Sequence, residues 1–192
     1  SVQDGLSRVL DTPLGGPLGN LQLNQLNEKR RIHELSFDVP IAHKGNPIQA
    51  SDLAHAFLKS PKANFGTSYI EHLQALDISS RGFLTGSIDL VFTDKKDNSK
   101  ARWWIIDWKS NWLGNEDKEK ELINCGPLHY DEKSMGREMI KHHYPLQAHI
   151  YLVALHRYLE WRLPGYNPHD HLGGYIYLFL RGIPSKKELT HR

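Results

Sequence analysis

Two short segments rich in β-branched and aromatic residues, separated by a polar run, constrain the fold of this chain more than any other feature. The segments are Gly86 to Thr93 and Ala101 to Lys109, and the run from Asp94 to Lys100 between them contains Asp97 and Asn98. This pattern is typical of two strands joined by a turn. We therefore predict an antiparallel hairpin.

Each strand of this hairpin carries a carboxylate among apolar residues, which is costly unless the charge is paired or binds a cation. If the turn is centred on Asn98, residues whose numbers add up to about 196 face each other across the pair. Asp89 then faces Asp107 on one side of the sheet, and Lys109 shares that side. The expectation depends on the register, because a shift of one residue would separate the two acids.

Two adjacent carboxylates repel each other and favour a divalent cation between them. Oxygen ligands suit Mg²⁺ or Mn²⁺, and such a metal can polarise a phosphoryl oxygen and activate water. Lys109 could position that water and stabilise charge on the phosphate. The set predicts phosphodiester hydrolysis. The alternative is that Asp107 and Lys109 form an ordinary surface salt bridge and Asp89 is a strand-edge acid.

Periodicity predicts the other main elements. Alternation with period two indicates a half-buried strand from Lys29 to Ile41. Leu146 to Leu163 has the spacing of a long amphipathic helix that ends before Pro164-Gly165. Gly173 to Gly182 is too apolar for a solvent-facing side, so we expect a central strand covered on both faces. The apolar face of the helix is predicted to contain Leu146, Ile150, Val153 and Ala154.

Weaker patterns predict helices over residues 50–59 and 68–76, a Gly- and Pro-rich connector over 11–20, and exposed helix and loop over 116–143. The order of elements indicates an α/β fold with a mixed sheet flanked by helices. The first residues read as the middle of a helix, so we expect a fragment of a longer protein.

Composition narrows the class of protein. The chain has 192 residues, a length typical of one domain, and 24 basic against 22 acidic side chains give a net charge of +2. The net charge of the whole chain therefore does not indicate nucleic acid as a binding partner, although a local basic groove is compatible with this charge. One Cys allows no internal disulfide or Cys-pair zinc site. The single Cys favours a reducing, cytoplasmic setting. No segment approaches the roughly 18 apolar residues of a membrane span, so we expect no membrane binding.

Four motifs, in this order along the chain, resemble the RecB-type nuclease domain, which is the C-terminal domain of exodeoxyribonuclease V beta subunits. They are Gly86-Ser87-Ile88-Asp89, Ile106-Asp107-Trp108-Lys109-Ser110-Asn111-Trp112-Leu113-Gly114, Gln147-Ala148-His149-Ile150-Tyr151 and the segment Gly173 to Gly182. The resemblance is dense from Gly82 to Ile183 and looser back to Glu34. It implies a restriction-endonuclease-like core of the PD-(D/E)xK superfamily over residues 29–183, after a lead-in over 1–28 and before a tail over 184–192.

The resemblance also implies roles for individual residues. Asp89, Asp107 and the backbone carbonyl of Trp108 correspond to metal ligands, and Lys109 to the lysine of the PD-(D/E)xK motif. A further acidic residue needed for cleavage corresponds to Glu34. DNA-positioning residues are expected at Gln147 and Tyr151, which share a helical face at i and i+4, and at Trp112, which could stack a base.

The function implied by the resemblance is a Mg²⁺-dependent deoxyribonuclease, with Mn²⁺ as a substitute, that cuts DNA unwound by a tethered helicase. ATP would serve only that helicase. The implied partners are DNA and the RecC and RecD subunits, in double-strand-break repair and recombination. The metal-binding His of the family lies upstream of the matched segment, so His55 is not assigned to that role.

Two other functions stay open: a catalytically silent module for DNA binding or subunit docking, and a stand-alone restriction-type endonuclease. Other chemistry-bearing residues are interpreted as ordinary solvent-exposed or core groups. A zinc site is not assigned to His142, His143, His169 and His171, nor a nucleophile and base to Cys125 and His129. Base stacking is not assigned to Trp103, Trp104 and Trp108, which are expected to be packing residues. A basic groove is not assigned to Lys118, Lys120, Lys133, Arg137 and Lys141, which alternate with acidic residues as on a solvated helix.

Overall fold

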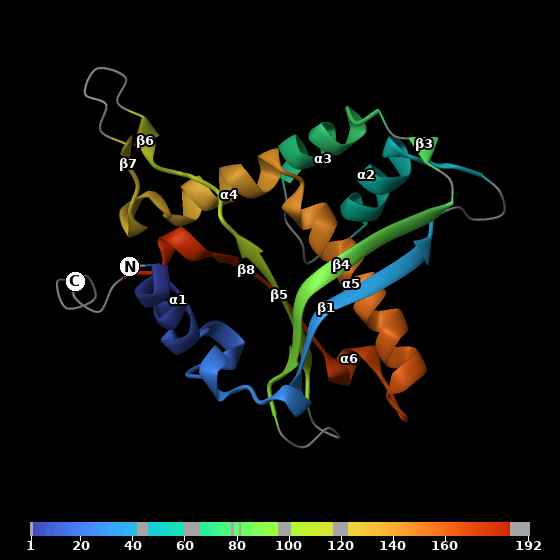
Figure 1. The fold of residues 1–192 in the computed structure, drawn as a ribbon. Helices are drawn as coiled ribbons and strands as arrows, with labels where there is room; N and C mark the ends of the chain where they lie inside the picture. The colour runs from blue at the N-terminus through green and yellow to red at the C-terminus, as the bar shows by residue number, and fades with distance from the viewer. Residues whose placement is uncertain are drawn as a thin grey trace. The chain divides into compact units, whose positions relative to one another are not determined.

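The computed structural model describes residues 2–41, 46–59, 66–77, 79–80, 82–95, 101–116 and 123–184. The chain divides into two compact units, residues 1–35 with 88–192, and residues 36–87. Its elements (Figure 1) are α1 (Val2–Asp11), η1 (Gly16–Leu18), η2 (Leu23–Gln25), η3 (Glu28–Arg30), β1 (Arg31–Pro40), β2 (Ile48–Gln49), α2 (Ala50–Leu58), α3 (Gly66–Gln74), β3 (Ser79–Ser80), β4 (Phe83–Thr93), β5 (Trp103–Lys109), β6 (Asn115–Glu116), β7 (Ile123–Asn124), η4 (Pro127–His129), α4 (Glu132–Lys141), α5 (Tyr144–Arg162), α6 (Pro168–His171), β8 (Leu172–Phe179) and η5 (Leu180–Gly182).

The main sheet has the strand order β1-β4-β5-β8. β4 and β5 pair antiparallel from Leu90 opposite Ile106 to Thr93 opposite Trp103, so the predicted hairpin and its register are confirmed. Residues 96–100, where the turn was expected, lie outside the described residues. β5 and β8 pair parallel, which makes the sheet mixed and confirms the predicted α/β fold.

The prediction that residues 173–182 form a central strand is wrong in one respect. β8 stands at the end of the strand order in the described part of the sheet, next to β5. Its residues are nevertheless at least half-buried, and Ile176 and Leu178 pack against the apolar core. An apolar run indicates that both faces of a strand are buried. It does not indicate whether both edges of the strand pair with other strands.

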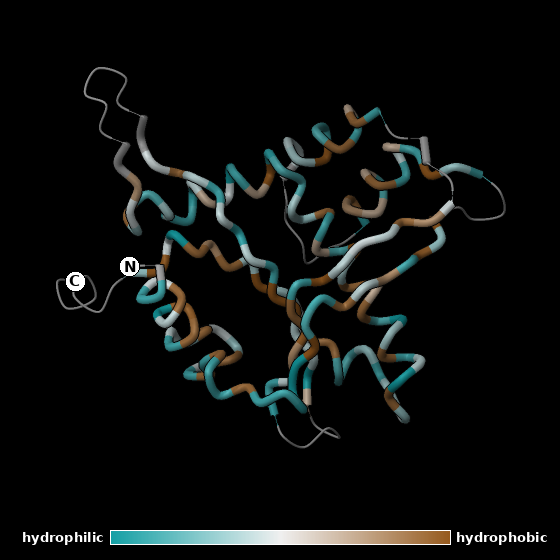
Figure 2. The backbone as a smooth tube through the Cα atoms, in the orientation of Figure 1, coloured by the Kyte–Doolittle hydropathy of each residue, from teal (hydrophilic) through white to brown (hydrophobic). Residues whose placement is uncertain are grey.

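The core of the first unit lies on one face of this sheet. Its buried members are Val9, Leu23, Leu26, Leu90, Phe92, Trp104 and Ile106, so α1 and the segment after it are anchored on the hairpin. Figure 2 shows hydrophobic residues recurring along these strands. The predicted connector over 11–20 contains the single turn η1.

The long helix was predicted at nearly its observed position, and its apolar face was predicted correctly in part, because Ala154 is buried and Leu146 and Ile150 are half-buried. α5 runs from Tyr144 to Arg162, while Val153, placed on the apolar face, is 46% exposed. The buried residues are Pro145, Ala148, Ala154, Leu155 and Leu159. Apolar spacing alone does not distinguish between adjacent faces of a helix.

Helices predicted over 50–59 and 68–76 correspond to α2 and α3, and the strand predicted over 29–41 corresponds to β1. α4 confirms a helix in the charged segment over 116–143, whereas the short antiparallel pair β6–β7 was not predicted. Among the residues described, no helix combines the length and the apolarity needed to cross a membrane.

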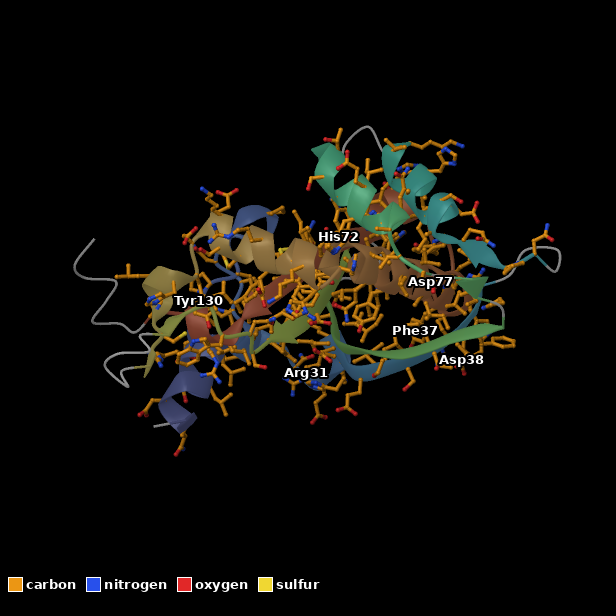
Figure 3. All side chains as sticks on the ribbon, turned by 90° about the horizontal axis from the view of Figure 1, so that it is seen from above. Arg31, Phe37, Asp38, His72, Asp77 and Tyr130 are labelled. Atoms are coloured by element: carbon orange, nitrogen blue, oxygen red, sulfur yellow. The ribbon has the colours of Figure 1, made fainter. Side chains whose placement is uncertain are left out.

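The second unit contains α2 and α3. Phe57 of α2 and Tyr69 of α3 are buried and meet edge to face, with ring centroids 5.5 Å apart. In β1, the half-buried Phe37 and the exposed Asp38 follow each other, as alternation requires (Figure 3). The Phe37 ring occupies the space that a Cβ atom on Gly86 would fill, so a glycine is needed in β4 at that position.

Glycine at position 173 gives the first prediction. A Cβ atom there would overlap the indole ring of Trp104, which is 6% exposed and cannot move aside. We expect Gly173→Ala to lower the free energy of unfolding by about 1–3 kcal/mol through overpacking. The matched control is Gly136→Ala in α4, where a Cβ meets no atom within 4 Å and helix propensity should raise stability by up to about 1 kcal/mol. Urea unfolding checks both, and equal midpoints for the two variants would contradict the packing argument.

Candidate active site

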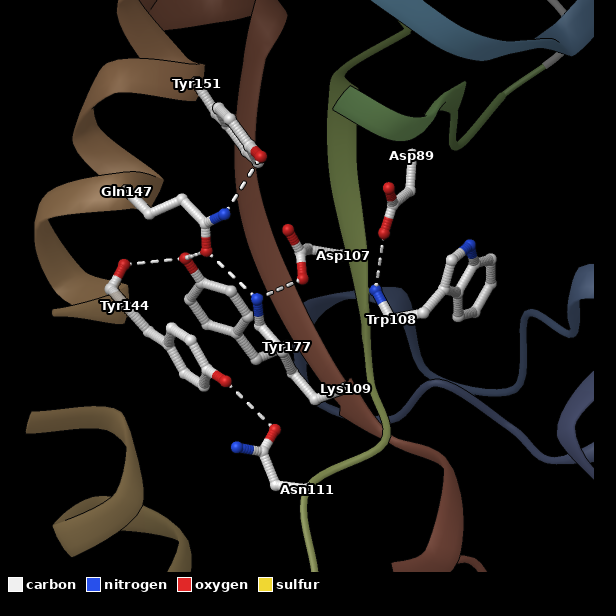
Figure 4. Close-up of polar contacts among 9 residues, drawn as sticks. All are labelled: Asp89, Asp107, Trp108, Lys109, Asn111, Tyr144, Gln147, Tyr151 and Tyr177. Atoms are coloured by element: carbon white, nitrogen blue, oxygen red, sulfur yellow. Dashed lines mark hydrogen bonds and ion pairs between the residues drawn. The ribbon is translucent and has the colours of Figure 1, made fainter. Parts of the chain in front are cut away.

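Asp89 and Asp107 lie on the adjacent strands β4 and β5. The antiparallel pairs end with Leu90 opposite Ile106, one residue before the two acids. There the carboxylate of Asp89 replaces the strand ladder, because its Oδ2 accepts a hydrogen bond from the backbone N–H of Trp108 at 2.9 Å (Figure 4). Asp107 is only 5% exposed. The predicted register therefore brings the two acids to neighbouring positions on the hairpin.

Lys109 joins Asp107 to helix α5. Its Nζ forms an ion pair with Asp107 Oδ1 at 2.5 Å and donates a hydrogen bond to Gln147 Oε1 at 3.0 Å. The Nε2 of Gln147 donates in turn to the Tyr151 hydroxyl at 2.9 Å. Asp107, Lys109, Gln147 and Tyr151 thus form one continuous polar network, drawn in Figure 4.

Burial shifts the pKa values of the acidic groups in this network. Burial is the largest cause that raises the pKa of Asp107 above its ordinary value; the charge of Asp89 adds to the increase, and Lys109 opposes it. Burial, followed by the charge of Asp107, also raises the pKa of the Tyr151 hydroxyl. A positive charge in addition to that of Lys109 would relieve the repulsion between the two carboxylates.

The donor set fits a hard divalent cation. Carboxylate oxygens from two adjacent strands suit Mg²⁺, which is usually held by one or two carboxylates and keeps several waters. The described residues contain no group of three or more His, Cys, Asp or Glu side chains placed to hold a metal. The peptide of Trp108 contacts Asp89 through its N–H, and the expected role of its carbonyl stays a prediction.

Glu34 lies in β1 with its side chain exposed and makes no described contact with this network. Its φ of 50° is in the left-handed region, which is rare for a residue other than glycine. His33 and Glu34 are both exposed, so the alternation of β1 is interrupted at this point. Strained backbone of this kind often occurs at functional sites.

Glu34 gives the second prediction. Because glycine tolerates this φ, we expect Glu34→Gly to keep or raise the free energy of unfolding, by up to about 1 kcal/mol, even though it removes a side chain. If Glu34 serves cleavage, the same variant loses nuclease activity. Thermal unfolding and a DNA cleavage assay measure the two effects, and Glu34→Gln separates the charge from the backbone. A Gly variant that is both destabilised and fully active would contradict this role.

Trp112 lies beyond the end of β5 and outside the network. It is 40% exposed, and the Arg181 guanidinium lies 5.5 Å from its ring centroid. Arg181 also donates to the Ser110 carbonyl oxygen at 3.1 Å, which holds this pair beside the strand end. An exposed indole with an adjacent cation is a surface on which a base can stack. The DNA-positioning role of Trp112 is compatible with this geometry and stays a prediction.

Two residues of the site were missed by sequence reasoning. The rings of Tyr144, at the start of α5, and Tyr177, in β8, both contact the Lys109 ammonium. Tyr177 pairs with Asp107 in the parallel register of β5 and β8. The only signal in the sequence was a tyrosine three residues before Gln147 and another in an apolar strand, and neither position indicates a lysine partner.

The groups interpreted as ordinary have local partners. His142 Nε2 pairs with Glu138 Oε1 at 2.9 Å, and His171 Nδ1 accepts from the Asn167 N–H at 3.0 Å. The Sγ of Cys125 lies 3.4 Å from the Tyr130 hydroxyl. Lys133, Arg137 and Lys141 are exposed on α4, whereas Lys118 and Lys120 lie outside the described residues. Trp104 is buried, and Trp103 and Trp108 are half-buried, as expected for packing residues.

A mixed sheet flanked by helices, with two acids and a lysine on adjacent strands, places the chain among proteins with a restriction-endonuclease-like core. No protein family profile matches the chain. Comparison with curated proteins gives the RecBCD enzyme subunit RecB of several bacteria. The chain is 37% identical to that of Mycolicibacterium smegmatis over 181 residues, 34% identical to that of Escherichia coli over 182, and 33% identical to that of Haemophilus influenzae over 186.

These alignments cover 90%, 95% and 95% of the chain, respectively. The chain belongs to the RecB family. It spans only 16%, 13% and 13% of the length of these three relatives.

Proposed function

We propose that this chain is a RecB-type nuclease domain that hydrolyses phosphodiester bonds of DNA with Mg²⁺ as cofactor. The observation that carries the proposal is the network of Asp107, Lys109, Gln147 and Tyr151, with Asp89 on the adjacent strand. These are the residues that the RecB resemblance assigns to metal and DNA, and they come from three separate segments of the chain.

Each residue has a distinct part in the proposed reaction. Asp89 and Asp107 would hold the Mg²⁺, which when bound supplies an electrophile for a phosphate oxygen and lowers the pKa of water. Lys109 offers its ammonium to the phosphate or to the attacking water. Gln147 orients that ammonium through its amide oxygen and contacts Tyr151, so α5 can fix the position of a DNA strand beside the acids.

The substrate and partners follow from the family. Its members named here are subunits of the RecBCD enzyme, and we propose that this domain acts on DNA unwound by a tethered helicase, with RecC and RecD as partner subunits, in double-strand-break repair and recombination. Mn²⁺ would substitute for Mg²⁺, and ATP would be needed only by the helicase.

A second candidate is a silent module that binds DNA or docks a subunit. One observation favours it: the described residues offer two acids, not three or more metal-ligating side chains, for a cation. In addition, Asp107 and Asp89 already have partners within the protein, namely Lys109 and the Trp108 N–H.

Cleavage of circular single-stranded DNA by the 192-residue chain distinguishes the two candidates. With Mg²⁺ or Mn²⁺ we expect linear and shortened products, and with EDTA or with Ca²⁺ alone we expect none. Cleavage that persists in EDTA would contradict the metal mechanism. Binding of DNA without cleavage, together with no Mg²⁺ or Mn²⁺ binding in calorimetry, would instead support the silent module.

A further inference from the structure

We propose that Tyr144 and Tyr177 are positioning residues for Lys109, and that their two ring faces form an aromatic cradle that holds its ammonium with one N–H free for substrate. The part of this inference that concerns the reaction rests on the proposed nuclease function. The cradle itself rests on contacts among three residues of the first unit.

The ammonium lies against both rings. Lys109 Nζ is 3.8 Å from the ring centroid of Tyr144 and 4.9 Å from that of Tyr177. The two rings are stacked, with centroids 5.1 Å apart and an interplanar angle of 24°. Cations within about 6 Å of a ring centroid are attracted by the negative face of the ring, and the attraction is stronger at sites shielded from water. Lys109 is only 8% exposed, so the shielded case applies.

Hydrogen bonds fix the orientation of each ring. The Tyr144 hydroxyl donates to Asn111 Oδ1 at 2.9 Å, and Asn111 Nδ2 donates to Glu138 Oε1 at 3.0 Å. The Tyr177 hydroxyl lies 2.6 Å from the carbonyl oxygen of Tyr144 and 3.1 Å from Gln147 Oε1 (Figure 4). The cradle is therefore tied to the loop after β5, to α4 and to the start of α5.

Hydrogen-bond acceptors among the described residues account for two of the three donors of the ammonium. A lysine has three N–H donors and no acceptor. In the described structure, Asp107 Oδ1 and Gln147 Oε1 accept two of them. The ring faces stabilise the positive charge without the lone pair that another carboxylate would offer. A phosphate oxygen or a water molecule can then accept the third N–H.

A series of fluorinated rings at position 144 tests this role in the full 192-residue chain. Phenylalanine, 4-fluoro-, 3,5-difluoro- and 3,4,5-trifluorophenylalanine keep nearly the same shape but progressively weaken the negative face of the ring. We expect kcat for single-stranded DNA to fall stepwise along the series, by about tenfold in total, while KM changes little. Tyr144→Leu should lose at least as much as the trifluoro variant. Tyr166→Phe, in the loop after α5, is the control and should leave kcat unchanged.

Nuclear magnetic resonance gives a readout that needs no cleavage. The Lys109 side-chain protons, identified by their loss in Lys109→Met, should be shifted upfield by the Tyr144 ring. The shift should persist in Tyr144→Phe and fall in Tyr144→Leu to the part that the more distant Tyr177 ring contributes. If the wild-type chain cleaves no DNA under any condition, the proposed function fails while this shift still tests the cradle. A flat kcat along the fluorinated series would overturn the positioning role, and a Lys109 spectrum without the ring shift would overturn the cradle.

Discussion

Asp107→Asn is expected to lower the rate of DNA cleavage by about 10³-fold, the larger end of the effects seen when one group that stabilises transition-state charge is removed. Asparagine keeps the size of the side chain and an oxygen that can accept the hydrogen bond from Lys109. It removes the charge with which Asp107 would hold Mg²⁺. The loss should therefore appear in kcat and in Mg²⁺ affinity, and the variant should also lose some stability because Lys109 is left without its ion-pair partner.

Single-turnover cleavage over a range of Mg²⁺ concentrations measures this effect, with Asp38→Asn, an exposed acid of β1, as the matched control. Burial raises the pKa of Asp107, so this carboxyl takes up a proton at a higher pH than an exposed aspartate does. Because a bound metal must displace that proton, wild-type activity should decline as the pH falls toward this raised pKa, and the control should show the same profile. Cleavage by Asp107→Asn within tenfold of the wild type would exclude Asp107 as a metal ligand.

Lys109→Met should have the second largest effect, and it acts on stability as well as on cleavage. The side chains of Lys109 and Asp107 are only 10% and 7% exposed, so removing the ammonium leaves Asp107 buried without its ion-pair partner. We expect a loss of about 3 kcal/mol in the free energy of unfolding, the usual size when one partner of a buried pair is deleted, together with loss of cleavage. Urea unfolding measures the first effect.

The double variant Asp107→Asn/Lys109→Met should recover most of that stability, since neither charge then remains buried alone. Mg²⁺ should also stabilise Lys109→Met, because a cation bound to the native state compensates Asp107 and raises the unfolding free energy by mass action. Additive losses in the double variant would contradict the coupling of the two residues. Equal stability of Lys109→Met with and without Mg²⁺ would argue against a metal site at the acids.

The hairpin and the placement of the two acids could be predicted from sequence because the information is local. Strand composition, a polar turn and the count of residues across it determine which residues face each other, and Leu90 opposite Ile106 agrees with that count. The pairing of Gln147 with Tyr151 was also accessible, since positions i and i+4 of a helix are neighbours.

The features that could not be predicted depend on packing between distant segments. The end position of β8 in the strand order is set by which strands pair, and an apolar run does not encode that order. The face that α5 buries is set by what the helix packs against, so Val153 is exposed although its spacing is apolar. The left-handed backbone conformation of Glu34 could not be predicted, because glutamate normally avoids this conformation and nothing in the sequence marks the exception.

The parallel pairing of β5 with β8 has a consequence for the order in which the groups around Lys109 come together. Parallel strands need a long crossover connection, and pairing between segments so far apart in sequence is intrinsically slow. A nascent chain that has emerged only through β5 already contains both acids and the lysine, but it lacks Tyr177, which pairs with Asp107. The complete set of groups around the lysine is therefore assembled only when β8 docks against β5, so a chain interrupted before β8 would hold both acids and the lysine without this aromatic partner.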